Sequence, residues 1–102
     1  MFDILVKDGR VIDGTGRPSY KANIGIQGDT LTILRGDSTN LASNQIIDAK
    51  GCIVAPGFID MHSHSDLALL TEPTHIAKIS QGVTTEALGM DGLSYAPISQ
   101  KK

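Results

Sequence analysis

Two histidines spaced two residues apart, with carboxylates close by, are the residues of this chain whose types and spacing suit chemistry. They are His62 and His64, within Asp60-Met61-His62-Ser63-His64-Ser65-Asp66. Alternate side chains of an extended strand share a face, so both imidazoles and the Asp60 carboxylate would point the same way. Imidazole is a common ligand of zinc, but a closed zinc site requires three or four ligands. The pair alone is therefore a weak signal, and its value depends on where the fold places it.

The elements around this pair predict a βαβ unit. Residues 58–62 are expected to form a strand that ends in the polar segment. Glu72-Pro73 is expected to open a helix, since proline suits the first helical turn. Gln81-Gly82 would end it, and the β-branched residues 83–88 would form the next strand. Strands joined by such a crossover are parallel, and ligands bind at their carboxyl ends.

Asp91 is a third candidate ligand, because it follows the second predicted strand by a few residues. Consecutive parallel strands usually lie side by side, so the loop after one emerges beside the end of the other. A carboxylate beside two imidazoles suits a borderline-hard divalent ion such as zinc. Asp-Gly is also a common turn pair, and the residues alone leave both interpretations open.

Residues 1 to about 56 are expected to be rich in β-structure. The turn pairs Asp8-Gly9 and Gly28-Asp29 predict two hairpins. Residues 35–44 are polar and predict an exposed loop. The expected strands cover residues 2–7, 10–13, 22–27, 31–34, 46–49 and 52–55.

Composition excludes several classes of protein. The net charge of -2 argues against nucleic-acid binding, which requires clustered basic residues. No segment approaches the roughly 18–20 apolar residues that cross a bilayer, so we expect no membrane association. A single cysteine cannot form an internal disulfide, and Met1-Phe2-Asp3 does not open a secretory signal. We expect a protein of the cytoplasm.

The length of 102 residues is too short for a whole (β/α)₈ barrel, which needs about 250. One crossover helix cannot cover both faces of a parallel sheet. We therefore expect an N-terminal portion of a larger fold or a truncated product, with a complete small α+β domain as the alternative. An uncovered sheet edge predicts poor solubility or self-association, although the oligomeric state stays open.

The motifs resemble a known family. Residues 54–66, Val-Ala-Pro-Gly-Phe-Ile-Asp-Met-His-Ser-His-Ser-Asp, resemble the metal-binding signature of the amidohydrolase superfamily. Residues 2–16, 81–86 and 89–97 are similar to those of N-acyl-D-amino-acid deacylases, the D-aminoacylases. The resemblance extends from Phe2 to Pro97.

This resemblance implies an α/β architecture of two parts. Residues 1–56 would belong to a small β-sandwich, and residues 57–102 would begin a metal-dependent (β/α)₈ TIM barrel. His62 and His64 correspond to the family's metal-binding histidines. Asp91 stands in Gly-Met-Asp-Gly where the family has Gly-Asn-Cys-Gly, with the cysteine a zinc ligand. Carboxylate is harder than thiolate, so metal preference is expected to differ.

The implied activity is zinc-assisted hydrolysis of the linear amide of a small N-acyl amino acid, with metal-activated water as nucleophile. Asp60 and Asp66 are candidates for orienting the histidines. Two further histidines and a catalytic aspartate come from later strands of the family. We find no convincing general base in residues 1–102 and expect no deacylase activity from them alone. Dihydroorotase-, hydantoinase- or isoaspartyl-dipeptidase-like enzymes, and a non-catalytic β module, remain alternatives.

Three other residues are assigned structural roles or left open. Cys52 lies in an apolar run and is expected to be a buried small hydrophobic residue. His75 is expected on a solvated helix face, away from the strand end. Glu86, in the second strand, could join a polar network in the interior or point outward.

Overall fold

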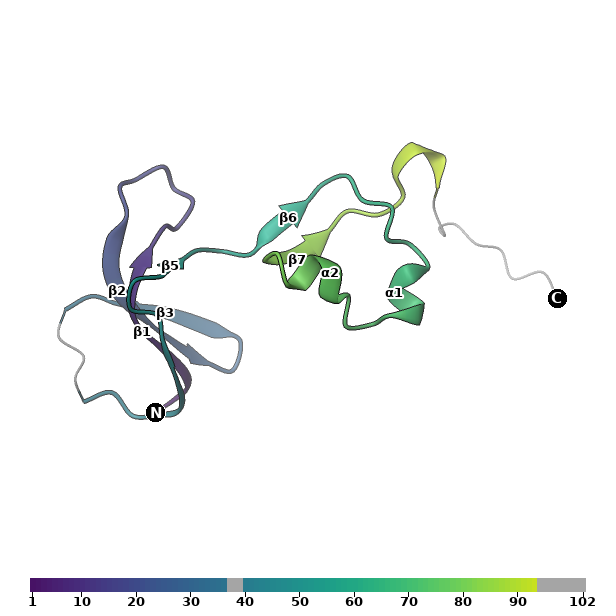
Figure 1. The fold of residues 1–102 in the computed structure, drawn as a ribbon. Coiled ribbons are helices and arrows are strands. Elements are labelled where there is room, and N and C mark those ends of the chain that lie inside the picture. Colours follow the sequence, from purple (N-terminus) through teal and green to yellow (C-terminus); the bar gives the residue numbers. More distant parts are fainter. Residues whose placement is uncertain (37–39, 94–102) are drawn as a thin grey trace. The chain divides into compact units, whose positions relative to one another are not determined.

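The computed structural model describes residues 1–36 and 40–93. Its contacts divide the chain into two compact units, Met1–Pro56 and Gly57–Lys102 (Figure 1). The expected loop at 35–44 lies partly outside the described residues. Among the described residues, no helix has the length and apolar character that a membrane crossing demands.

The first unit is a five-stranded mixed sheet. Its strands are β1 (Phe2–Val11), β2 (Tyr20–Gln27), β3 (Thr30–Leu34), β4 (Ser43–Asp48) and β5 (Ile53–Val54). The strand order is β3-β2-β1-β4, and β5 also pairs with β1. The β1–β2 and β2–β3 pairs are antiparallel, whereas β4 and β5 run parallel to β1.

The core of this unit lies between β1 and β2. Val11, Ala22 and Ile24 form a buried cluster, with Val54 packed against it, and Leu5 is 1% exposed. The β1–β2 pair also requires a glycine. A Cβ at Gly25 would lie 2.4 Å from the ring of Phe2, so this close approach excludes any larger residue without movement of the ring.

The first predicted hairpin is wrong, and the second is confirmed. Asp8-Gly9 makes no turn, because β1 continues through it with a register shift between Val6 and Gly9. Asp8 has φ of 59°, and its N–H donates to Asn23 Oδ1 at 2.7 Å. Positive φ suits a bulge as well as a hairpin turn, which explains the error. Gly28, with φ of 58°, does connect β2 and β3.

The second unit holds a parallel pair of strands joined through two short helices (Figure 1). Its elements are β6 (Phe58–Asp60), α1 (Ala68–Thr71), α2 (Ile76–Ile79), β7 (Val83–Glu86) and the 3₁₀ turn η1 (Met90–Gly92). The predicted parallel pairing is confirmed, with Asp60 opposite Glu86. Both strands are shorter than expected: β6 ends at Asp60 and β7 ends at Glu86.

The predicted helix opening at Glu72-Pro73 is wrong. These residues instead separate α1 from α2, and Glu72 has φ of -130° and ψ of 76°. A residue before proline is driven out of the α-region, so Pro73 ends one helical turn rather than starting another. Gly82 has φ of 83° and follows α2 as expected. A mixed sheet and a βαβ unit are thus present, while the sandwich and the barrel remain predictions.

Candidate metal centre

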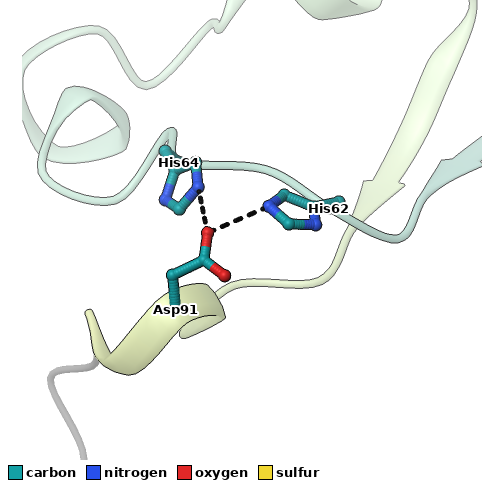
Figure 2. Close-up of side chains that lie close together, drawn as sticks. All are labelled: His62, His64 and Asp91. Carbon is teal, nitrogen blue, oxygen red and sulfur yellow. Dashed lines mark hydrogen bonds and ion pairs between the residues drawn. The ribbon is translucent and has the colours of Figure 1, made fainter.

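Three side chains converge beyond the carboxyl ends of β6 and β7. His62 and His64 lie in the segment after β6, and Asp91 lies in η1, after β7. The Nε2 atoms of His62 and His64 lie 3.2 Å and 3.1 Å from Asp91 Oδ2. Figure 2 shows both imidazoles directed toward this carboxylate. The three potential ligand atoms all lie within 4.8 Å of one another.

The local backbone, rather than strand alternation, brings the histidines together. β6 ends at Asp60, so His62 and His64 do not occupy successive positions on one face of a strand. The side chain of Asp60 accepts the backbone N–H of His62 at 3.1 Å, which shapes the chain as it leaves the strand. Asp91 has a left-handed backbone with φ of 55°, between Gly89 at 85° and Gly92 at 78°. The left-handed conformations shape the turn that carries the carboxylate.

The three side chains could hold a divalent metal ion. In a tetrahedral site with bonds of about 2.0–2.2 Å, neighbouring ligand atoms are separated by about 3.3–3.6 Å. The observed nitrogen–oxygen separations of 3.1 Å and 3.2 Å are close to this range. The side chains of His62, His64 and Asp91 are 64%, 44% and 64% exposed, so the donor set is accessible to solvent. Two imidazoles and a carboxylate would leave a fourth position for water or substrate.

The two aspartates expected to orient the histidines behave differently. Asp60 contacts the backbone of His62 rather than its ring, and its Oδ2 lies 2.5 Å from Lys78 Nζ. The hydrogen bond from Lys78 lowers the pKa of Asp60 below its ordinary value. Asp66 has φ of 34°, and its buried Oδ1 has no hydrogen-bond partner among the described residues. No imidazole contact of Asp66 is seen there.

A polar cluster lies beside the three converging side chains, and the sequence left this possibility open for Glu86 alone. The His75 side chain is only 16% exposed, so the predicted solvated helix face is wrong. Its Nε2 contacts Ser65 Oγ at 3.1 Å and Glu86 at 3.3 Å. The Glu86 side chain is 9% exposed, so it points inward and joins a polar network rather than pointing outward. The sequence did hold one signal for this cluster, namely the carboxylate of Glu86 in a strand of β-branched residues. A buried carboxylate needs hydrogen-bond partners, so its presence there points to polar side chains around it.

The interpretation of Cys52 as a buried residue is also wrong, since its side chain is exposed. β5 begins only at Ile53, and Gly51 has φ of 81°. The Cys52 N–H donates to Ala49 O at 2.9 Å, so Cys52 belongs to the turn before the strand. The exposed thiol lines a cavity of the first unit with Arg10 and basic residues of neighbouring strands and turns.

Imidazoles and a carboxylate at the ends of adjacent parallel strands define a candidate metal-binding site in an α/β unit. A sequence model of the amidohydrolase family matches residues 45–96. D-aminoacylase from Alcaligenes xylosoxydans xylosoxydans is 43% identical over 98 residues, which cover 96% of this chain and 20% of that protein. The chain belongs to the amidohydrolase family, and the resemblance inferred from its motifs is confirmed.

Two solved structures are similar in backbone as well as sequence. One, from work on the binuclear metal centre of D-aminoacylase, has a TM-score of 0.85 and 42% identity, covering 96% of this chain and 20% of that one. The other is N-acyl-D-glutamate deacylase from Bordetella bronchiseptica, complexed with zinc and a phosphonate inhibitor. Its TM-score is 0.87 and its identity 40%, covering 94% of this chain and 20% of that one. This chain thus spans about one fifth of the length of these relatives.

Proposed function

We propose that this chain supplies part of the metal centre of an amidohydrolase that hydrolyses the amide bond of N-acyl-D-amino acids. The convergence of His62, His64 and Asp91 beyond β6 and β7 carries the proposal. In this proposal residues 1–56 are a portion of a β-sandwich, and residues 57–102 begin a (β/α)₈ barrel. The substrate class is supported by the relatives, which are named D-aminoacylase and N-acyl-D-glutamate deacylase.

The two imidazole Nε2 atoms and Asp91 Oδ2 would hold zinc. A bound zinc ion acts as a Lewis acid and lowers the pKa of its water to about 7. All three side chains are exposed, so water and a small amide could reach a metal bound there. Asp91 contributes a negative charge, which partly offsets that of a divalent cation and leaves a net positive centre for an amide carbonyl.

The neighbouring carboxylates are poor candidates for the general base. Hydrogen bonding to Lys78 lowers the pKa of Asp60. Burial opposes ionisation of Glu86, but hydrogen bonds from Ser65, His75, Lys78 and Ser63 outweigh it and lower its pKa as well. A carboxylate with a lowered pKa accepts a proton less readily, so these groups are better suited to fixing positions than to moving protons.

Two experiments test this function, one on the metal and one on the reaction. Zinc binding to the chain is measured by calorimetry for the wild type and for the variants His62→Ala, His64→Ala and Asp91→Ala. The reaction is measured in a chimera in which this chain replaces the 98-residue matching segment of the Alcaligenes D-aminoacylase. N-acetyl-D-amino acids and their L-enantiomers serve as substrates, and Glu72→Gln on the exposed surface is the matched control.

We expect near-stoichiometric zinc that each ligand variant weakens, and D-selective hydrolysis by the chimera that each variant reduces. Zinc binding that is unchanged by all three substitutions would rule out these residues as the zinc site. A folded chimera that binds zinc but leaves N-acyl-D-amino acids intact would refute the substrate class alone. A folded chimera that binds no divalent metal would favour a non-catalytic module.

A further inference from the structure

A second group of polar residues lies next to the proposed ligands and is not accounted for by metal binding. Its centre is Glu86, at the end of β7, whose side chain is 9% exposed. Ser63 is 5% exposed and is the most buried residue near the histidines. Burying a carboxylate is costly unless several donors compensate it, so the contacts of Glu86 must be numerous.

Four side chains compensate that carboxylate. The hydroxyls of Ser63 and Ser65 donate to Glu86 Oε1 at 3.1 Å and 3.0 Å. Lys78 Nζ lies 3.3 Å from the same oxygen, and His75 Nε2 lies 3.3 Å from both carboxylate oxygens. Contacts to an ionised group are stronger than neutral hydrogen bonds, so this cluster is well suited to holding a loop in one conformation.

The cluster is not a nucleophilic triad. Such a triad needs the serine at one ring nitrogen of the histidine and the carboxylate at the other. Here Ser65 Oγ and Glu86 both contact Nε2 of His75. Ser65 also donates its hydroxyl to Glu86 directly, so the carboxylate orients the serine instead of activating it.

The two serines flank His64 in the sequence, which links the cluster to the metal centre. Ser63 Oγ accepts the backbone N–H of Ser65 at 3.3 Å and lies 2.9 Å from its hydroxyl. The turn of residues 63–65 is thus closed on itself and fixed to Glu86 on both sides of His64. Fixing both neighbours of a residue restricts the backbone from which its imidazole projects.

Lys78 connects this anchor to the one that holds His62. Its Nζ contacts Asp60 Oδ2 as well as Glu86 Oε1. Asp60 Oδ1 in turn accepts the N–H of His62. The backbone at each histidine is therefore tied to one of two carboxylates, and a single ammonium group joins them.

We propose that Glu86 is a positioning residue of the metal centre: through the hydroxyls of Ser63 and Ser65 it fixes the backbone at His64 so that the imidazole faces Asp91. This inference rests on the proposed function, because it assigns His64 to a metal. Glu86 itself contacts neither of the histidines that converge on Asp91 in the described structure. Glu86 therefore affects how firmly the His64 imidazole is held, and it does not change which residues bind the metal.

The test compares Glu86→Gln with Glu72→Gln, which changes an exposed glutamate of the same unit. Zinc affinity of the full chain is measured by calorimetry against a competing chelator. Loss of a group that orients a metal ligand typically weakens binding about 10- to 100-fold. We expect a weakening of this size for Glu86→Gln at unchanged stoichiometry, and a change within about twofold for the surface control.

A second readout needs no metal and separates this inference from the proposed function. ¹⁵N relaxation of the metal-free chain reports the mobility of residues 62–65, which Glu86→Gln is expected to increase and Glu72→Gln to leave unchanged. If Glu86→Gln does not fold, Ser65→Ala removes one anchor without removing the carboxylate and is expected to change both readouts in the same direction.

The outcomes are distinct. A folded chimera with the Alcaligenes D-aminoacylase that binds no zinc overturns the proposed metal site, while the relaxation data on the chain still decide whether Glu86 orders the turn. Zinc binding unchanged within twofold in a folded Glu86→Gln or Ser65→Ala variant, with unchanged mobility of residues 62–65, overturns the positioning role. Weaker zinc binding together with a more mobile turn supports it.

Discussion

Replacing Gly57 with alanine should disrupt the candidate metal centre without changing a proposed ligand. An added Cβ would lie 2.1 Å from Oγ1, 2.3 Å from Cγ2 and 2.7 Å from Cβ of Thr84. Thr84 lies at the register shift of the β6–β7 pair, between the partners of Phe58 and Ile59. Rotation of the threonine side chain moves the first two atoms but not its Cβ, which the backbone fixes. The two strands must therefore move apart.

The size of the effect follows from the overlap. Insertion of a methyl group into a closely packed site costs about 1–3 kcal/mol when the backbone must shift. Since about 1.4 kcal/mol corresponds to a factor of ten, the strand pair should open about 5- to 150-fold more often. Two hydrogen bonds report this opening: the N–H of Phe58 to Gly82 O and the N–H of Ala87 to Asp60 O, each 2.8 Å long.

Amide hydrogen exchange followed by NMR measures the opening at Phe58 and Ala87. Thr84→Gly removes the obstructing side chain, and the double variant completes a thermodynamic cycle. We expect the double variant to recover part of the protection lost in Gly57→Ala, with a coupling of about 0.5–3 kcal/mol. Exchange in Gly57→Ala within twofold of wild type, or strictly additive effects in the cycle, would refute the steric reasoning.

Three further predictions concern the ligands, the charges and the core. Asp91→Cys should shift metal preference toward softer ions, measured as a rise in the cadmium-to-calcium affinity ratio; an unchanged ratio contradicts the ligand role. Asp60 has a lowered pKa, so its stabilising contribution should be present above about pH 4 and lost as pH falls through the lowered value. Lys78 has a raised pKa, so its contribution to stability should be present below pH 10.5 and lost as pH rises through the raised value. In Lys78→Met, ¹³C titration should find the pKa of Asp60 closer to its ordinary value. Leu5→Ala should destabilise the first unit by about 2–5 kcal/mol in denaturant unfolding, whereas Leu31→Ala, at a side chain 58% exposed, should cost much less; equal losses would contradict the assigned core.

The sequence predicted the features that depend on short-range chemistry and on the topology of parallel strands. The β2–β3 hairpin followed from Gly28-Asp29, and the parallel β6–β7 pair followed from the βαβ pattern. Adjacent parallel strands bring their carboxyl ends to one edge, which is why Asp91 could be expected near the histidines.

Other features could not be predicted, because one local signal serves several structures. Asp8-Gly9 suits a turn, but pairing of β1 with three other strands favours a continuous strand with a bulge. Pro73 suits the first turn of a helix, yet its effect on Glu72 ends α1. The environment of His75 depends on a contact with Glu86 across eleven residues, which helical periodicity does not reveal.

Mainly polar contacts hold the residues of the candidate metal centre in place. In the described part of the second unit Ser63, at 5% exposure, is the one buried residue, while Phe58, Ile59 and Met61 are each more than 60% exposed. Apolar packing among these residues therefore contributes little to holding His62 and His64 against Asp91. The carboxylates of Asp60 and Glu86 and the β6–β7 hydrogen bonds perform that task instead. Because a metal bound only by the folded arrangement adds stability by mass action, zinc should protect the amides of this unit more than those of the first.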